Sequence, residues 1–461
     1  MTWPEAGDTI AAISTPPGEA GIGIVRLSGP QAEGIARRLF RPRRARIPWQ
    51  SHRLYLGHIL DSHGHVLDEV LLTLMRAPHT YTREDVVEIH CHSGFAVLKA
   101  ILGEILAQGA RLARPGEFTL RAFLAGRLDL SQAEAVLEVI QARTQASLRV
   151  AAAHLAGGLG KRLEEVRNAL LNLLAGVEAA VDFPEEAAEL SPQALSADLA
   201  GPLAELTSLL ATYRQGRLLR EGVGVVLAGR PNVGKSSLLN RLLNADRAIV
   251  TDIPGTTRDV IEETISLAGI PLRLSDTAGL REARDLVEEL GVARSRERLA
   301  QADLILFLVD ASEPLSGEDI QTLEDLADRP VLIVLNKIDL PPQIKVQDLR
   351  LYSSHPVVEV SALTGQGLEH LEQAMVELVL AGGVQTSGEI VTQARQAELL
   401  GRAQEALNRG RELLEQAEPP WELLAFEIRE ALQALGEITG EEVGDAVLDQ
   451  IFSEFCIGKY G

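Results

Sequence analysis

Apolar and polar residues are arranged in three different ways along the chain, and each pattern predicts a different architecture. In residues 1–124, turns and a helical stretch separate short apolar runs, which include GIGIVRLSG, YLGHIL, VLDEVLLTLM and DVVEIHCH. This alternation is typical of a small α/β domain. Residues 125–220 are rich in Ala and Leu with apolar positions at helical spacing, which predicts long helices that Pro184 interrupts.

Residues 221–382 show the third pattern, which is a series of continuous apolar runs. These runs are VGVVLAG, IPLRLSD, LILFLVD, VLIVLNK and PVVEVSA. Because strands buried on both faces are apolar throughout, they predict a mostly parallel, doubly wound sheet. The helical pattern returns in residues 383–461. The chain is therefore predicted to be a multi-domain α/β protein, in which the domain of residues 221–382 is inserted into a discontinuous all-α domain.

Four short motifs follow the predicted strands of the inserted domain. GRPNVGKSS begins at Gly229, directly after a strand and before a helix, and has the spacing of a phosphate-binding loop. Lys235 is expected to reach the β- and γ-phosphates, and Ser236 to bind Mg²⁺. The other motifs are DTAG from Asp276, NKID from Asn336 and SAL from Ser361. All four lie at carboxyl ends of strands, where open α/β sheets bind ligands.

The NKID motif identifies the base of the nucleotide. A carboxylate at Asp339 can accept two hydrogen bonds from guanine, a pair of donors that adenine lacks. We therefore predict GTP as the ligand. The predicted GTP-binding residues are Asn232, Val233, Gly234, Lys235, Ser236, Ser237, Thr251, Asp252, Ile253, Pro254, Gly255, Thr256, Thr257, Asp276, Thr277, Ala278, Gly279, Asn336, Lys337, Asp339, Ser361, Ala362 and Leu363.

Composition and charge limit the ligands and the cellular location that are expected for this protein. The net charge is −21, which argues against a broad nucleic-acid-binding surface, although the basic run from Arg37 to Arg53 could contact phosphates or be a solvated loop. Two cysteines provide no disulfide framework. The first residues lack the features of a signal peptide, and no apolar run is long enough to cross a membrane. These features predict a cytoplasmic protein.

The combination of motifs resembles one family, the tRNA modification GTPase family MnmE, also called TrmE. The likeness rests on GRPNVGKSS, TDIPGTTRD, DTAGLREARDLVEELG, NKID and the terminal FCIGK, and on STPPGEAGIGIVRLSG, EDVVEIHCHSG and RPGEFTLRAFLAGRLDLSQAEAV near the N-terminus. It covers essentially the whole chain. The resemblance implies an N-terminal folate-binding and dimerisation domain, a split helical domain and an inserted Ras-like P-loop GTPase domain.

The resemblance also implies an activity and partners. Such proteins form homodimers and act with the FAD- and NADH-dependent protein MnmG, in a heterotetramer. The pair adds a carboxymethylaminomethyl or aminomethyl-type group to carbon 5 of the wobble uridine of certain tRNAs. The one-carbon unit comes from a tetrahydrofolate derivative, either the 5-formyl or the methylene form. GTP hydrolysis in the family depends on K⁺ and on dimerisation of the GTPase domains.

Site residues carried over from the resemblance fall into three groups. Folate contacts are expected from Arg26, Glu88, Arg127 and Lys459. The family usually has Lys at the position of Arg127. In the family the chain usually ends at the lysine of FCIGK, whereas here Tyr460 and Gly461 follow it. K⁺ is expected at Asn232, Thr251, Ile253 and Thr256, and Mg²⁺ at Ser236 and Thr257. Leu280 stands where many GTPases have a water-orienting Gln, and the resemblance implies Glu288 in that role.

Several alternatives remain open at this point. On a strand, Glu88, His90 and His92 would share one face, either as a metal triad or as the wall of a polar pocket, with Cys91 in the core behind them. Cys456 could be a reactive thiol or a buried anchor of the last helix. Three function classes compete: a GTP-driven tRNA-modification enzyme, a GTPase switch without further chemistry, and a folate-dependent one-carbon enzyme with a regulatory GTPase domain.

Overall fold

The computed structural model describes residues 7–16, 18–44, 48–183, 191–244, 263–276, 302–380 and 389–455. The chain forms two compact units, each assembled from separate segments. The first contains residues 1–137, 154–199 and 405–461, and the second contains residues 138–153 and 200–404. Helices predicted for one discontinuous domain are thus shared between the two units. The domain boundaries at 124, 220 and 382 remain predictions.

The first unit begins with a seven-stranded sheet. Its order is β3-β4-β5-β6-β2-β1-β7, and every pair is antiparallel except β1 with β7. The strands are β1 (Ile10–Ile13), β2 (Ala20–Ser28), β3 (Phe40–Pro42), β4 (Arg53–Leu60), β5 (Val66–Met75), β6 (Val86–Ser93) and β7 (Arg111–Leu112). The predicted apolar runs correspond to β2, β4, β5 and β6.

Two helices cover one face of this sheet. They are α1 (Ala32–Leu39) and α2 (Phe95–Ala107), and their apolar residues share a single core with the strands. On the opposite face, Leu54, Leu56 and Leu71 are all at least 40% exposed. The sheet therefore has one packed face and one open face that carries apolar side chains.

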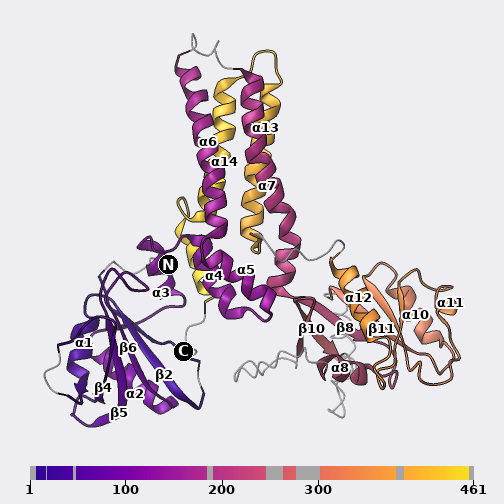
Figure 1. Cartoon of the computed structure of the whole chain (residues 1–461), viewed down its shortest axis with the longest axis horizontal. Helices are drawn as coiled ribbons and strands as arrows, with labels where there is room; N and C mark the ends of the chain where they lie inside the picture. The colour runs from indigo at the N-terminus through magenta and orange to yellow at the C-terminus, as the bar shows by residue number, and fades with distance from the viewer. Residues whose placement is uncertain are drawn as a thin grey trace. The chain divides into compact units, whose positions relative to one another are not determined.

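The helices of the first unit are α3 (Glu117–Leu124), α6 (Gly158–Asp182), α14 (Trp421–Thr439), α15 (Asp445–Ser453) and most of α4 (Leu130–Gln141). Helices α6 and α14 run side by side (Figure 1). An ion pair joins Arg429 of α14 to Glu178 of α6. A second joins Arg167 of α6 to Glu441, which lies just beyond the end of α14. Leu120, Leu130 and Phe452 belong to a second small core, through which α15 packs against α3 and α4.

The second unit contains the doubly wound sheet, with the order β13-β12-β11-β8-β10-β9. Its strands are β8 (Val223–Ala228), β9 (Glu263–Leu267), β10 (Ile270–Asp276), β11 (Leu304–Asp310), β12 (Val331–Asn336) and β13 (Val357–Glu359). Every residue of β11 and β12 is buried, as their continuous apolar sequences require. All pairs are parallel except β10 with β9, which confirms the predicted fold class.

Strand β9 was not predicted, because its sequence ETISL has no continuous apolar run. It joins β10 through Ala268 and Gly269, which both have positive φ, 49° and 87°. Two such residues form the tight hairpin turn that suits twisted strands. Ala is uncommon at the first position of that turn, so only Gly269 matches the usual sequence of such a hairpin.

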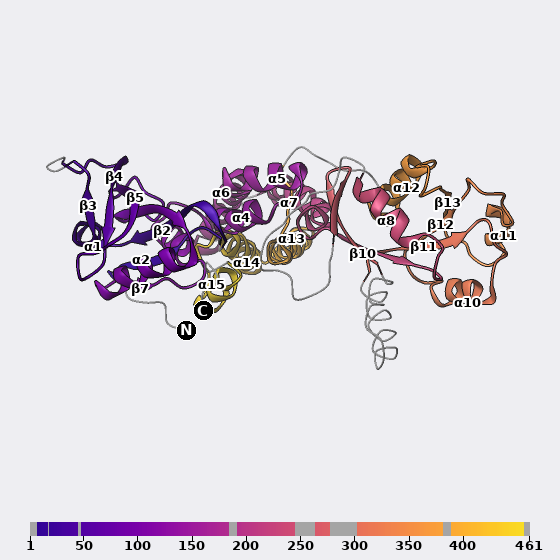
Figure 2. The same cartoon turned by 90° about the horizontal axis from the view of Figure 1, so that it is seen from below.

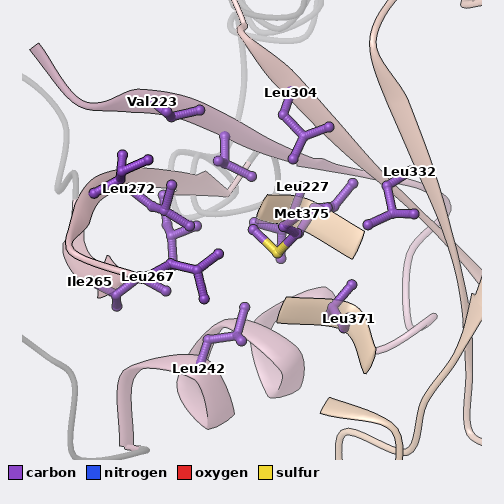
Figure 3. Packing of buried hydrophobic residues seen from close by; sticks show 14 of the residues in the cluster. Val223, Leu227, Leu242, Ile265, Leu267, Leu272, Leu304, Leu332, Leu371 and Met375 are labelled. Atoms are coloured by element: carbon purple, nitrogen blue, oxygen red, sulfur yellow. The ribbon is translucent and has the colours of Figure 1, made fainter. Parts of the chain in front are cut away.

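Helices cover both faces of this sheet. Figure 2 shows α8 (Lys235–Asn244) and α12 (Leu368–Leu380) on one side and α10 (Gly317–Asp325) on the other, and the short α11 (Val346–Leu349) packs in the same core as α10. In the core below α8 and α12, Leu242, Leu371 and Met375 meet Leu227 and Leu332 of the sheet (Figure 3).

Helical segments complete the second unit. They come from α5 (Gln145–Leu155), α7 (Pro192–Glu221) and α13 (Ala394–Leu414). Val150 of α5 and Leu218 of α7 belong to the same core as β9 and β10. Gln404 of α13 donates a hydrogen bond to the Thr207 hydroxyl of α7. Among the helices that the structure describes, none combines the length and apolarity needed to span a membrane.

Candidate nucleotide site

The loop between β8 and α8 is shaped by two glycines that no other residue could replace. Gly229 has φ +134°, and a Cβ there would lie 2.4 Å from the Leu308 carbonyl oxygen. Gly234 has φ +102°, and a Cβ there would lie 2.2 Å from Nδ2 of Asn336. Both positions need the left-handed backbone and the missing side chain of glycine. The loop therefore packs tightly on its supports, as a phosphate-binding loop must.

Lys235 stands at the first turn of α8 with its ammonium group over this loop. Its Nζ donates hydrogen bonds to the carbonyl oxygens of Gly229 and Arg230, both at 2.8 Å, and the residue is 7% exposed. The charge is therefore held at the centre of the loop, where the free N–H groups of the α8 N-terminus also converge. The neighbouring Asn232, Ser236 and Ser237 are exposed at the same loop and helix start.

Asn336 connects the loop to the segment that is expected to read the base. It ends β12 and is 1% exposed. Its Nδ2 donates to the carbonyl oxygen of Val233 at 2.8 Å, and its Oδ1 accepts from the amide of Ala362 at 3.0 Å. Because each atom of the side-chain amide has a partner, Asn336 fixes the distance between the two loops.

Asp339 and Ser361 belong to the two loops that Asn336 adjoins, and a hydrogen bond joins their side chains. The Ser361 hydroxyl donates to Oδ1 of Asp339 at 2.6 Å and accepts from the Thr364 amide at 3.1 Å. Asp339 is exposed, and Leu363 is 78% exposed. The structure thus orients the Asp339 carboxylate from one side and leaves its remaining lone pairs accessible. The expected contact between the Ala362 amide and guanine remains a prediction.

Lys337 forms an ion pair with Asp310, a residue that was not among the predicted site residues. Its Nζ lies 2.5 Å from Oδ2 of Asp310, the last residue of β11, and its backbone has φ +66°. Burial by itself would raise the pKa of Asp310, but the hydrogen bond from Lys337 and those from Ser312 bring that pKa below its usual value. The position of Asp310 at a strand end, like Asp276 and Asn336, was the signal that could have identified it.

Part of the predicted nucleotide site lies outside the described residues. These positions are Thr251, Asp252, Ile253, Pro254, Gly255, Thr256, Thr257, Thr277, Ala278, Gly279 and Glu288. Of Asp276, the structure describes only the backbone, which ends β10 opposite Leu227 of β8. The carboxyl end of β10 thus lies next to that of β8, where the phosphate loop begins, and the position of the rest of DTAG remains a prediction.

The predicted folate residues of the first unit come together on the sheet. Arg26 of β2 lies opposite Glu88 of β6, and its Nε and Nη2 contact Oε1 of Glu88 at 2.8 and 2.7 Å. The guanidinium of Arg127 lies 4.7 Å from the ring centre of Tyr81 and donates to the Tyr81 carbonyl oxygen at 3.1 Å. Lys459 lies outside the described residues, as does Cys456.

Two aromatic residues missing from the prediction join this group. The Arg26 guanidinium is 6.0 Å from the Tyr81 ring centre and 5.8 Å from that of Phe118. Tyr81 lies on a turn and Phe118 on α3, so neither belongs to a periodic pattern that would mark it from sequence. The site therefore combines two guanidinium groups, one carboxylate and two aromatic rings.

The histidines of β6 support the polar-wall interpretation of this face. Glu88, His90 and His92 share it as expected, with His90 Nε2 at 3.3 Å from Glu88 and His92 Nδ1 at 2.8 Å from Asp68. Within the described ranges, no group of three or more His, Cys, Asp or Glu side chains could hold a metal ion. Cys91 is buried behind them, which confirms its place in the core, and burial raises the pKa of its thiol to about 11.

The geometry defines the class of the protein. A phosphate loop shaped by glycines lies at the carboxyl ends of parallel strands. The asparagine of NKID joins it to a second loop, beside which the Asp339 carboxylate is exposed. That arrangement is the nucleotide site of a P-loop GTPase.

Comparison with known proteins identifies the family. A family model described as the MnmE helical domain matches residues 130–456, and one described as the GTP-binding protein TrmE N-terminus matches residues 9–127. The tRNA modification GTPase MnmE of Chloroflexus aurantiacus is 51% identical over 98% of this chain and 100% of its own length. The MnmE protein of Heliobacterium modesticaldum is 48% identical over 98% of this chain and 100% of its own length. That of Synechococcus sp. is 49% identical over 100% of both chains. The chain belongs to the MnmE family of tRNA modification GTPases.

Proposed function

We propose that this chain is a K⁺-dependent GTPase that modifies the wobble uridine of certain tRNAs. The observation that carries the proposal is the double hydrogen bond of Asn336, which joins the phosphate loop at Val233 to the base-reading loop at Ala362. Full-length similarity to proteins named tRNA modification GTPases supports the choice of tRNA as the substrate.

In this proposal the second unit binds GTP with its own residues. Lys235 and the N-terminus of α8 hold the phosphates, and Asp339 accepts the two guanine hydrogens. The close approach of Gly229 and Gly234 to Leu308 and Asn336 holds the loop in a shape that a side chain at either position would disturb. Mg²⁺ at Ser236 and Thr257 would neutralise phosphate charge, which is its usual role in such sites.

Hydrolysis requires a group that holds the attacking water, and we assign this role to Glu288. The carboxylate would orient the water or accept its proton. Asn232, Thr251, Ile253 and Thr256 would bind K⁺, which would supply positive charge where the transition state becomes more negative. Asn232 has φ +66° and an exposed side chain, so its amide is presented outward from the loop. Pairing of two GTPase domains would complete the site.

The first unit would bind a reduced folate, as 5-formyl- or methylene-tetrahydrofolate. Arg26 and Arg127 suit the carboxylates of such a ligand, while Tyr81 and Phe118 offer faces for its aromatic rings. Glu88 can accept hydrogen bonds from a pterin-type amide while it orients Arg26. Lys459 would contribute a further positive charge, and Cys456 a thiol, from the chain end.

The proposed partners follow from the same family membership. A second copy of the chain would form a homodimer, and the open face of the N-terminal sheet, with Leu54, Leu56 and Leu71 exposed, supports this. The flavoprotein MnmG would join the homodimer in a heterotetramer and provide redox chemistry with FAD and NADH. The group added to carbon 5 of the uridine would be of the aminomethyl or carboxymethylaminomethyl type, and the complex would act in the cytoplasm.

Replacement of Asp339 by Asn tests the nucleotide assignment. The amide would offer guanine a donor where it needs an acceptor, so we expect GTP affinity to fall about 100-fold. Xanthosine triphosphate has an oxygen at the position of the guanine amino group, so the Asp339→Asn variant should bind it and hydrolyse it in K⁺. The control is Asp348→Asn, the same change at an exposed position of α11 in the same unit. Unchanged GTP affinity in Asp339→Asn would show that this pocket does not read guanine.

A further inference from the structure

One stretch of the first unit is rich in arginine and free of acidic residues. Between Gly34 and Leu60 there are seven arginines, at positions 37, 38, 41, 43, 44, 46 and 53, and neither Asp nor Glu. The whole chain contains 65 acidic residues and has a net charge of −21. Positive charge is therefore concentrated locally in a protein that is otherwise strongly acidic.

The structure separates these arginines into two groups. Arg37 is paired with Glu33 at 2.6 Å and packs over the Trp49 ring at 4.4 Å, while Arg38 donates to Gln108 at 2.6 Å. The second group consists of Arg41, Arg43, Arg44 and Arg53. All four are exposed, and no hydrogen bond or ion pair to another described residue engages their side chains. Their charges are thus not neutralised by the part of the fold that the structure describes.

The pairing of β3 with β4 sets the positions of Arg41 and Arg43. Strand β3 is the outermost strand of the sheet and pairs with β4, with Arg41 opposite His58. The Arg43 amide continues this pairing with a hydrogen bond to the Leu56 carbonyl oxygen at 2.9 Å. Phe40 is buried in the core, so Arg41 lies on the opposite side of β3, at the outer edge of the open face. The exposed Leu54, Leu56 and Leu71, which the proposed homodimer would cover, lie farther in, on β4 and β5. Arg43 follows two residues later, about 6.6 Å farther along the strand.

A buried aromatic cluster anchors the segment on its inner side. Trp49 meets Phe40 edge-on with ring centres 5.8 Å apart and stacks on Tyr55 at 6.1 Å. The Tyr55 hydroxyl also accepts a hydrogen bond from the Gln50 amide at 2.6 Å. The arginines therefore project from a well-packed support.

Protection of an exposed sheet edge explains only part of this pattern. Charged residues on edge strands do prevent unwanted pairing, and Arg41 could serve that purpose. Arg43 and Arg44 lie beyond the last residue of β3 and need another explanation. Guanidinium groups bind phosphate through paired, planar hydrogen bonds, and a group of unpaired arginines is the usual footprint of a nucleic-acid backbone.

We infer that Arg41, Arg43 and Arg44 form a phosphate-binding surface, which we call the basic edge, and that it holds the backbone of the tRNA. This inference rests on the proposed tRNA function and adds the place where the RNA is held. The contacts are with phosphates, so they position the tRNA without reading its sequence.

The test uses the full-length protein and an unmodified tRNA transcript that carries a fluorescent label. Arg41→Gln, Arg43→Gln and Arg44→Gln are combined in one variant, and affinity is measured between about 50 and 200 mM KCl. We expect the variant to bind at least about tenfold more weakly at the low salt concentration, and the slope of log affinity against log salt to fall by about 2. GTP hydrolysis and thermal unfolding should match the parent protein.

A second triple variant controls for total charge. Arg214→Gln, Arg217→Gln and Arg411→Gln remove the same charge from exposed positions on α7 and α13 and should leave tRNA affinity within about twofold. An equal loss in both variants would show that only net charge matters, which would overturn the inference. Unchanged binding in the basic-edge variant would also overturn it, while the proposed function would stand.

Two further outcomes are informative. If the basic-edge variant bound tRNA normally but no longer formed a complex with the flavoprotein partner, the surface would be a protein-docking site and the inference would be wrong. If the parent protein bound no tRNA, alone or with that partner, both the inference and the tRNA part of the proposed function would fail.

Discussion

Asn336 donates a hydrogen bond from Nδ2 to the Val233 carbonyl oxygen at 2.8 Å, and so joins the end of β12 to the loop that follows β8. The same side chain accepts the Ala362 amide through Oδ1. One nearly inaccessible amide thus couples the region expected to hold the phosphates with the region expected to hold the base. The nucleotide itself would lie across both regions.

Asn336→Asp should disrupt this coupling with little change in shape. A carboxylate oxygen would replace Nδ2 and face the Val233 carbonyl oxygen, so an attraction becomes a repulsion between buried acceptors. We expect the free energy of unfolding of the second unit to fall by about 1–3 kcal/mol, and GTP affinity to fall at least about tenfold. Urea denaturation and nucleotide titration measure the two effects. Asn172→Asp, the same change on an exposed face of α6, should alter neither; parental behaviour of Asn336→Asp would contradict the coupling role.

A second prediction concerns stability in acid, because the first unit contains a buried ionic network. Glu117 is 2% exposed and accepts hydrogen bonds from Arg111 at 2.6 Å, from the Arg114 amide at 2.8 Å and from Arg121 at 3.1 Å. Burial alone would raise the pKa of Glu117, but these hydrogen bonds and the charge of Arg111 lower it below its usual value. The ionised carboxylate therefore stabilises the fold at neutral pH, and this contribution is lost as pH falls below about 4.5.

Glu117→Gln should destabilise the unit by about 3 kcal/mol at pH 7, because Arg111 and Arg121 lose the buried carboxylate that they share and keep only Asp8 and Glu84 as charge partners. The difference from the parent should shrink as pH falls from about 5 to 3. Trp49 fluorescence reports the unfolding of this unit when Trp3 and Trp421 are replaced by Phe. Glu19→Gln, at an exposed position, serves as the control. A difference that stayed constant with pH would refute the assignment of the acid sensitivity to Glu117.

The folate proposal predicts the effect of removing two positive charges. Arg26→Ala together with Arg127→Ala should abolish binding of 5-formyl-tetrahydrofolate in calorimetry. The comparison is Arg26→Lys, which keeps the charge but loses the planar contact with Glu88 and the two rings, and should bind with intermediate affinity. Arg53→Ala, on the same sheet, should bind folate normally. An unchanged affinity in the double variant would remove both residues from the site.

The catalytic proposal predicts that Glu288→Ala keeps GTP affinity near normal but loses most turnover in K⁺. Groups that orient or deprotonate water typically contribute roughly 10²–10⁴-fold to the rate. The K⁺-dependent pairing of GTPase domains should persist in this variant, which separates a catalytic defect from an assembly defect. Glu282→Ala and Glu289→Ala should be mild by comparison. A parental rate for Glu288→Ala would mean that another group handles the water.

The sequence predicted most of the nucleotide unit because its strands are apolar throughout and its motifs follow them directly. Gly229, Lys235 and Asn336 occur where β8, α8 and β12 begin or end, so local sequence was sufficient to place them. Strand β9 was missed because Glu, Thr and Ser break its apolar pattern. The sequence also gave no reason to connect Lys337 with Asp310, since 27 residues separate them and neither belongs to a shared periodic pattern.

Contacts on the N-terminal sheet were harder to predict because they join residues that lie far apart in the sequence. Arg26 and Glu88 are 62 residues apart and become neighbours only through the pairing of β2 with β6. Tyr81 and Phe118 come to Arg26 from a turn and a short helix, where no repeat marks an aromatic residue as part of a site. The resemblance supplied the charged residues of this group, and the three-dimensional fold supplied its aromatic ones.

Mass spectrometry of tRNA wobble nucleosides from cells that lack the gene for this chain tests the central claim most directly. Deletion should remove the group at carbon 5 of the wobble uridine, and expression of the parent protein should restore it. Glu288→Ala, expressed to the same level, should fail to restore it, because modification would require GTP hydrolysis. Wobble uridines that stay fully modified in the deletion strain would contradict the account.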